Sequence, residues 1–192
     1  MSFNVLIIPE DCVNDQFILK PIIRAMMTGI GKRKANIQIC MKPRLRGIAD
    51  ALDLKNLKDI IEQNGLFDLF LLLVDRDGDS NRKAKLRNRE KRTEEILRTN
   101  QAFFAENAWQ EIEVWILAGC KDIPSGWNWK EVREEINPKE VYYLPFAKQR
   151  NLHNTLGKGR KVLAEEAAAY YSRISEKCNE VAKLEQRISN LI

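Results

Sequence analysis

The sequence is poor in the side chains that many zinc sites and nucleophilic hydrolases use. It contains one histidine, His153, in 192 residues, and four cysteines, none of which are paired at C-x-x-C spacing. A Cys/His zinc site would therefore have to collect ligands scattered along the chain, and a histidine-dependent triad would have to use His153. Carboxylates are the remaining candidates for catalysis.

Long apolar runs are also missing. No stretch approaches the roughly 18 apolar residues of a membrane span, and no basic leader precedes the apolar segment 3–9. We expect a cytoplasmic protein with reduced thiols and no membrane contact. Because 44% of the 192 residues are hydrophobic, we expect a single domain over 1–192, with a core at about 3–120 and a loop-rich, helical extension over 121–192.

The first half of the chain alternates between two hydrophobic periods. Apolar runs predict strands over 3–9, 36–41 and 66–74, and a 3.6-residue rhythm predicts helices over 15–27 and 47–64. This strand–helix–strand order favours an α/β fold, with a mainly parallel sheet flanked by helices.

The second half has a weaker pattern. We expect a basic helix over 82–99, a fourth strand over 101–105 and a short helix near 129–136. Segment 111–120 fits a helix or a strand, and we favour a helix. A long helix is predicted over 161–190; it could be a dimer contact or a cover for the sheet, and we favour packing within the chain.

Positive charge is unevenly spread along the chain, with one group over 32–46 and a larger one over 76–92. The chain has 32 Lys and Arg against 27 Asp and Glu, a net charge of +5. A run of closely spaced cations is typical of a solvated helix face or of a surface that binds phosphate backbones. Eight cations lie between positions 76 and 92: Arg76, Arg82, Lys83, Lys85, Arg87, Arg89, Lys91 and Arg92.

Acidic residues follow two of the predicted strands. Glu10 comes after the first strand, and Asp75 and Asp77 come after the third. Parallel sheets bind ligands beyond the carboxyl ends of their strands, and carboxylates gathered there favour a hard cation such as Mg²⁺. The D-x-D-G-D segment could instead be a turn in which Asp79 or Ser80 caps the next helix.

Three segments together resemble the Toprim fold, in particular small proteins of the overcoming-lysogenisation-defect (OLD) nuclease type. The segments are I-P-E-D-C-V-N-D-Q-F-I-L at 8–19, D-R-D-G-D at 75–79 and I-E-V-W-I-L-A at 112–118. Relative to the family pattern, Asp11 stands in place of a glycine and Asn14 in place of an acid. The resemblance covers residues 3–120.

The resemblance implies a centre for a pair of Mg²⁺ or Mn²⁺ ions. It suggests Glu10 as a general base or acid, with Lys83 or Lys85 assisting catalysis. The metal ligands that it implies are Glu10, Asp75, Asp77 and Glu113, with Asn14 and Asp79 in the same clusters.

The implied function is a nuclease of a phage-defence or nucleic-acid-processing system that acts on DNA or RNA. A partner chain would supply targeting or ATPase function, and the formation of a homodimer is a further possibility. Two alternatives remain, a degenerate Toprim module that binds nucleic acid or a partner protein, and a phosphatase on a related sheet. The expected contacts to the nucleic-acid backbone are Arg76, Arg82, Lys83, Arg87, Lys158 and Arg160.

Overall fold

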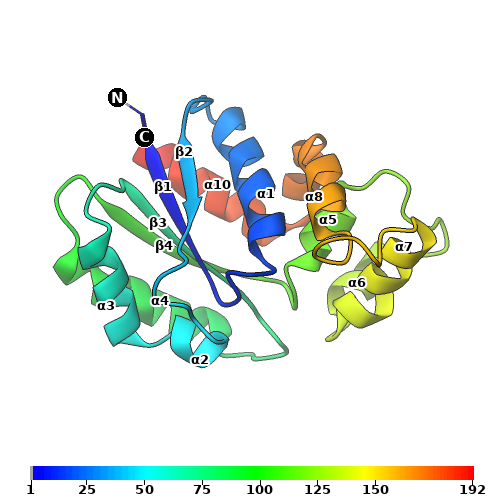
Figure 1. The fold of residues 1–192 in the computed structure, drawn as a ribbon, viewed down its shortest axis with the longest axis horizontal. Helices are drawn as coiled ribbons and strands as arrows, with labels where there is room; N and C mark the ends of the chain where they lie inside the picture. Colours follow the sequence, from blue (N-terminus) through cyan, green and yellow to red (C-terminus); the bar gives the residue numbers. More distant parts are fainter. Residues whose placement is uncertain (1) are drawn as a thin grey trace.

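Four parallel strands form the centre of the molecule. The structure, a computed structural model, describes residues 2–192. The sheet has the order β2-β1-β3-β4 and helices on both faces, a Rossmann-like α/β arrangement that confirms the predicted fold class (Figure 1). The strands are β1 (Asn4–Pro9), β2 (Asn36–Ile39), β3 (Leu69–Asp75) and β4 (Ala102–Ala108).

Strands β1 and β3 are neighbours although β2 lies between them in the chain. Their register pairs Val5 with Leu69 and Pro9 with Leu73, so both strands end at the same edge of the sheet. The chain leaves β1 towards β2 on one side, whereas β3 continues to β4 on the other. Open α/β sheets bind ligands at such a switch point.

The central strands are apolar on both faces, as expected for a covered parallel sheet. Successive side chains point to opposite faces, so Ile7 and Leu71 lie in one core while Ile8 and Leu72 lie in the other. The sheet is thereby fixed between two layers of helices.

The helices divide between these two cores. One face carries α1 (Gln16–Gly29), α5 (Glu113–Gly119), α8 (Arg160–Ala168), α9 (Tyr171–Lys177) and α10 (Asn179–Leu191). The other carries α2 (Ile48–Ala51), α3 (Leu54–Gln63) and α4 (Arg82–Thr93). Beyond the sheet end lie α6 (Trp129–Glu134) and α7 (Leu144–Gln149) (Figure 1). Two single turns complete the fold, the 3₁₀ turn η1 (Glu94–Ile96) and the π-helical turn η2 (Lys139–Tyr143). Within residues 2–192, none of the helices has the length and apolar character of a membrane span.

The prediction of one long C-terminal helix over 161–190 is wrong. The chain leaves helical geometry at Tyr170, with φ −118° and ψ 42°, and at Cys178, with φ −118° and ψ 92°. A straight 30-residue helix would extend about 45 Å, whereas three shorter helices wrap around the sheet. Helix α8 contacts α1 and α5, and α10 contacts β4, which confirms packing within the chain.

Three other predicted boundaries differ. The predicted helix 47–64 is divided into α2 and α3, because Asp53 is extended and its side chain accepts the Asn56 N–H at 2.9 Å as a helix cap. The basic helix ends at Thr93 rather than at 99, and β4 extends to Ala108 rather than to 105. Segment 111–120 is helical, as favoured, over Glu113–Gly119.

Helices α5 and α8 approach each other closely at a glycine. A Cβ atom on Gly119 would lie 2.8 Å from the Ala167 Cα and 2.7 Å from its carbonyl oxygen, closer than packed atoms tolerate. Glycine is therefore required there, and the contact brings Arg160 at the start of α8 to Glu113 at the start of α5.

Candidate metal centre

Acidic side chains meet at the carboxyl ends of β1, β3 and β4. Asp75 is the last residue of β3 and pairs in register with Ala108 of β4. Glu10 directly follows β1. Glu111 lies in the loop after β4, just before α5. Three segments that are distant in sequence therefore end at one rim of the sheet.

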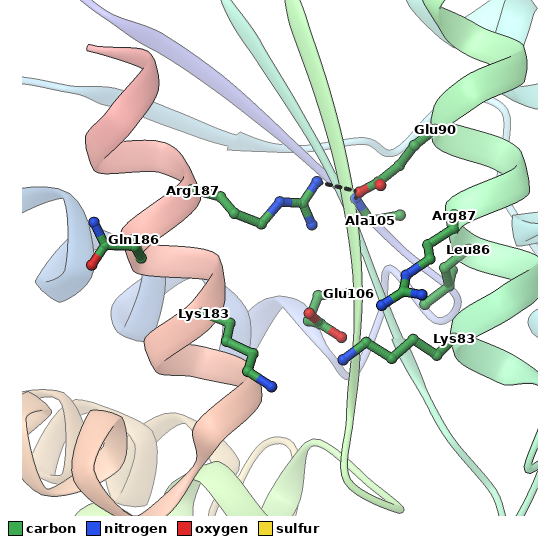
Figure 2. A pocket seen from close by; sticks show the side chains of 9 residues that line it. All are labelled: Lys83, Leu86, Arg87, Glu90, Ala105, Glu106, Lys183, Gln186 and Arg187. Carbon is green, nitrogen blue, oxygen red and sulfur yellow. Dashed lines mark hydrogen bonds and ion pairs between the residues drawn. The ribbon is translucent and has the colours of Figure 1, made fainter.

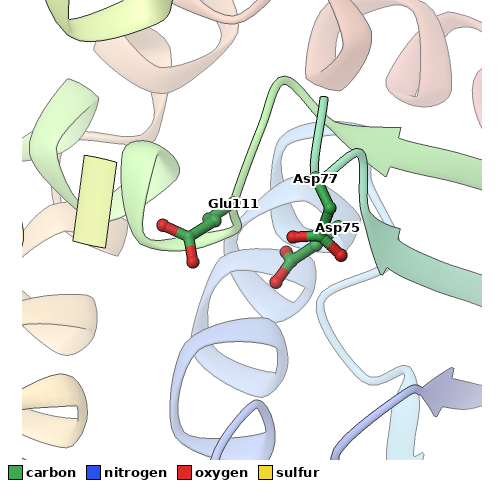
Figure 3. A group of neighbouring side chains, drawn as sticks. All are labelled: Asp75, Asp77 and Glu111. Atoms are coloured by element: carbon green, nitrogen blue, oxygen red, sulfur yellow. The ribbon is translucent and has the colours of Figure 1, made fainter. Parts of the chain in front are cut away.

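Asp75, Asp77 and Glu111 offer oxygens that all lie within 4.8 Å of one another (Figure 3). Two oxygens bound to one ion at 2.0–2.6 Å can be at most about 5 Å apart. The spacing of this group therefore suits a single hard cation.

The loop after β4 is fastened to the loop after β3 by Gln110. Its carbonyl oxygen accepts the N–H groups of Arg76 (2.7 Å) and Asp77 (3.2 Å), and its side-chain oxygen accepts the Gly78 N–H at 2.9 Å. Gln110 is buried and has a φ of 73°. These bonds hold Glu111 beside the two aspartates.

Backbone donors and a lysine hold the carboxylates themselves. The Ile112 N–H donates to Asp75 Oδ1 at 2.8 Å. The Lys139 N–H donates to Glu111 Oε2 at 2.8 Å, and the Lys139 ammonium lies 3.7 Å from the other oxygen of Glu111. Burial raises the pKa of Glu111. The ligand group is therefore positioned by the fold rather than by an ion.

Glu10 has a buried carboxylate oxygen, Oε2, that no hydrogen-bond donor within residues 2–192 contacts. Burial, and next the charge of Asp77, raise the pKa of Glu10 to about 7. Burial and the neighbouring Glu10 also raise the pKa of Asp75 well above its usual range. The two carboxyl groups are close enough to share a proton, and they repel when both are ionised.

Asp15, rather than Asn14, extends this group at the start of α1. Burial, followed by the charges of Glu113 and Glu10, raises the pKa of Asp15 to about 8. The Asn14 side chain instead donates to Asp11 Oδ2 at 2.7 Å. The acid next to position 14 therefore takes part in the electrostatics of the rim, while Asn14 holds the loop.

Glu113 is already bound to an arginine of the same chain. Its Oε1 accepts from Arg160 Nη2 at 2.6 Å and from Arg160 Nε at 3.0 Å, and both side chains are buried. Glu113 is thus held in an ion pair, and Arg160 lies inside the protein rather than on the surface where a backbone contact was expected.

Negative charge exceeds positive charge at this rim. Six carboxylates interact there: Glu10, Asp15, Asp75, Asp77, Glu111 and Glu113. Three cations accompany them: Arg82, Lys139 and Arg160. Buried like charges need a counter-ion or a proton, so the orphaned oxygen of Glu10 and the ligand group beside it fit a divalent cation.

The start of α4 holds several other predicted residues. Asp79 binds the Lys85 ammonium at 2.8 Å and the Asn81 N–H at 2.9 Å, so it stabilises the turn before α4 and lies outside the ligand group, although no side chain of residues 2–192 caps the helix itself. Arg82 is buried, 3.9 Å from Asp77 Oδ2, and donates to the Arg76 carbonyl at 3.3 Å. Arg82 therefore faces the acidic rim rather than open solvent.

The remaining predicted cations are dispersed. The Arg76 guanidinium stacks on Trp109, 3.9 Å from the ring centre. Lys83 and Arg87 line a cavity between α4 and α10. Lys158 is exposed, and its carbonyl oxygen accepts the Tyr143 hydroxyl at 2.9 Å. Of this set, Lys83 and Arg87 share one surface.

Sequence reasoning missed Glu111 and Gln110. The fourth strand was expected to end at 105, which leaves position 111 far from the rim. With β4 ending at Ala108, Glu111 follows the strand end by three residues, and Asp77 follows the end of β3 by two. A fourth strand predicted to end at Ala108 would therefore have placed Glu111 near the rim.

Comparison of the chain with family models, with curated proteins and with solved structures finds no match.

Proposed function

We propose that this protein is a Mg²⁺- or Mn²⁺-dependent nuclease that hydrolyses phosphodiester bonds of DNA or RNA at the carboxyl rim of its sheet. The observation that carries the proposal is the meeting of Asp75, Asp77 and Glu111 within 4.8 Å, beside a Glu10 oxygen that lacks a donor. The resemblance of its segments to OLD-type Toprim proteins supports the same function.

Asp75, Asp77 and Glu111 would hold the first cation, with Glu10 as a further ligand or proton acceptor. A bound divalent ion stabilises negative charge that develops on phosphate oxygens and lowers the pKa of water. Glu113 is the weakest of the expected ligands, because Arg160 binds its Oε1.

The chain supplies the other requirements of hydrolysis. The attacking water forms a bond to phosphorus and loses a proton, and Glu10 Oε2 is available to accept that proton because it lacks another donor. The bond from phosphorus to the leaving oxygen breaks, and that oxygen takes a proton from solvent. Arg82 beside Asp77 places a fixed positive charge at the reacting group.

The test is cleavage of single-stranded DNA, RNA and supercoiled plasmid with Mn²⁺ or Mg²⁺. We expect Asp75→Asn and Asp77→Asn to lower the rate at least about 100-fold, since each removes a ligand charge but keeps the shape. Asp59→Asn on α3, whose carboxylate has no hydrogen-bond partner within residues 2–192, is the matched control and should keep the rate.

Two outcomes would contradict the proposal. Binding of nucleic acid without cleavage in either metal indicates a degenerate binding module. Release of phosphate from small esters, with internal phosphodiester bonds left intact, indicates a phosphatase.

The biological setting belongs to the same proposal. A role in phage defence or nucleic-acid processing, with a partner chain that supplies targeting or ATPase function, follows from the resemblance alone.

A further inference from the structure

A charged cavity of about 610 Å³ lies along the outer edge of the sheet. Its walls are α4 on one side and α10 on the other, and its floor is β4 (Figure 2). Each helix presents two cations one turn apart on the same side, Lys83 and Arg87 on α4 and Lys183 and Arg187 on α10. Segments about 100 residues apart thus form one basic groove, which we name the β4 groove.

Two acids also line the β4 groove, but they neutralise only part of this charge. Glu90 Oε1 accepts from Arg187 Nη2 at 2.6 Å and from the Ala105 N–H at 2.6 Å. The charges of Glu90 and Arg187 therefore neutralise each other. Glu106 lies in the floor, and burial raises its pKa.

Lys83, Arg87 and Lys183 form no ion pair or hydrogen bond with other residues of the described range 2–192. Figure 2 shows the ammonium groups of Lys83 and Lys183 directed over the strand towards Glu106. Glu106 offsets part of this positive charge, and the remaining surplus of three cations over one acid fits a ligand with several negative charges.

The β4 groove continues towards the acidic rim. A second hollow of about 380 Å³ shares Lys83 and Lys183 with the first and is also lined by Trp109. Its other charged residues are paired, Lys130 with Glu134 and Arg133 with Glu180. Trp109 is 40% exposed. It lies two residues before Glu111, at the start of the loop that follows β4. Exposed aromatic rings beside cationic grooves stack the bases of single strands.

We propose that the β4 groove and Trp109 bind single-stranded nucleic acid and lead it to the carboxyl rim. The groove cations contact the backbone, and Trp109, whose ring also carries the Arg76 guanidinium at 3.9 Å, offers its exposed part to a base. A single strand is the favoured occupant because its unstacked bases are free to stack on an exposed aromatic ring, whereas the bases of a duplex are already stacked. This inference rests on the proposed function for its biological meaning, but not for its test.

The test measures binding of a labelled single-stranded DNA of 20 nucleotides by fluorescence anisotropy in EDTA over a series of salt concentrations. The variant Lys83→Gln/Arg87→Gln/Lys183→Gln should bind at least about tenfold more weakly at 0.1 M salt. The slope of log affinity against log salt should decrease by about 2, since each lost contact to a single strand contributes roughly 0.7.

The matched control removes the same charge elsewhere. The variant Arg24→Gln/Lys55→Gln/Lys58→Gln carries its changes on α1 and α3 and should lose less than about twofold. Trp109→Leu should weaken binding about tenfold, because it removes the ring on which a base would stack. Thermal melts of all variants check that they are folded.

Several results would overturn the inference. One is an equal loss of affinity in the groove and control variants, and another is equal affinity for a duplex of the same sequence. A third is displacement of the DNA by polyglutamate at equal charge concentration, which would indicate that the groove binds an acidic protein segment. Because binding is measured in EDTA, the two proposals can fail separately. Binding that depends on the groove, without cleavage, would contradict only the nuclease proposal. Cleavage with binding that does not depend on the groove would contradict only the groove proposal.

Discussion

The carboxyl rim of the sheet and the β4 groove are both rich in charged side chains, but they arrange them in opposite ways. At the rim the cations Arg82, Lys139 and Arg160 lie against carboxylates, and the carboxylates outnumber them, with Glu10 Oε2 lacking a donor. In the β4 groove the acid Glu90 is matched, and the unmatched groups are basic.

The two regions also differ in solvent access. Glu113 and Arg160 at the rim are 3% and 7% exposed, whereas Lys83 and Arg87 of the groove are exposed. Water screens the groove cations, so their surplus costs little stability. It screens the rim much less, so the acid surplus must be offset by protons or by a metal ion. A comparison of variants between the two regions should reveal this difference.

The largest effect is expected from the buried ion pair. Arg160→Met leaves Glu113 buried without a partner and should lower the free energy of unfolding by about 3–5 kcal/mol. Urea unfolding measures this change. Adding Glu113→Gln should restore part of the loss, because no charge then remains buried.

The groove provides the matched control for that experiment. Arg87→Met, in the exposed wall of α4, should change the free energy of unfolding by no more than about 0.5 kcal/mol. Equal losses for Arg87→Met and Arg160→Met would refute the contrast between the two regions.

Metal binding is expected to have the next largest effect. Because the unfolded chain lacks the ligand group, Mn²⁺ at one fixed concentration, about a hundredfold above its Kd at pH 8, should stabilise the protein at that pH by about 2.7 kcal/mol. The rise in Tm should be greater at pH 8 than at pH 6, since protons on Glu10 and Asp75 compete with the ion. Asp77→Asn should remove the rise, and Asp59→Asn should not.

The smallest effect concerns pH in the absence of metal. The pKa values of Glu10 and Asp15 are raised to about 7 and about 8, from ordinary values of 4.5 and 3.8. The folded chain therefore holds protons that the unfolded chain has released, and its stability falls as pH rises through this range.

We expect the free energy of unfolding in EDTA to decrease by about 1 kcal/mol per unit between pH 6 and pH 8, after allowance for partial exposure of both groups. Urea titrations at three pH values measure this slope, and Asp15→Asn should reduce it. A stability that rises with pH would show that the rim acids are not held in this way.

The core of the fold was accessible from sequence because its strands are apolar on both faces. Runs such as 66–74 and helical rhythms such as 15–27 report burial directly, and burial determines the layers. The position of Glu10 and Asp75 at one rim follows from parallel strands alone. This much of the candidate site could therefore be predicted.

The rest depends on long-range contacts that no local pattern records. Strand β4 contains Glu106 and Asn107, so its end resembles a loop in sequence and Glu111 was placed away from the rim. Arg160 lies in a glycine-rich polar stretch typical of a surface, yet its partner Glu113 is 47 residues away. The breaks at Tyr170 and Cys178 have no proline or glycine to announce them.

Glu90 has a consequence for how the sheet can associate. Strand β4 is an edge strand, and edge strands with unsatisfied N–H groups invite pairing with another chain. The Ala105 N–H donates to Glu90 at 2.6 Å and the Asn107 N–H donates to Glu106 at 3.1 Å. A neighbouring strand would have to displace both acids before it could extend the sheet. The side chains of β4 and α4 thus protect this protein from edge-to-edge aggregation by occupying the outward N–H groups of a strand that is itself largely buried.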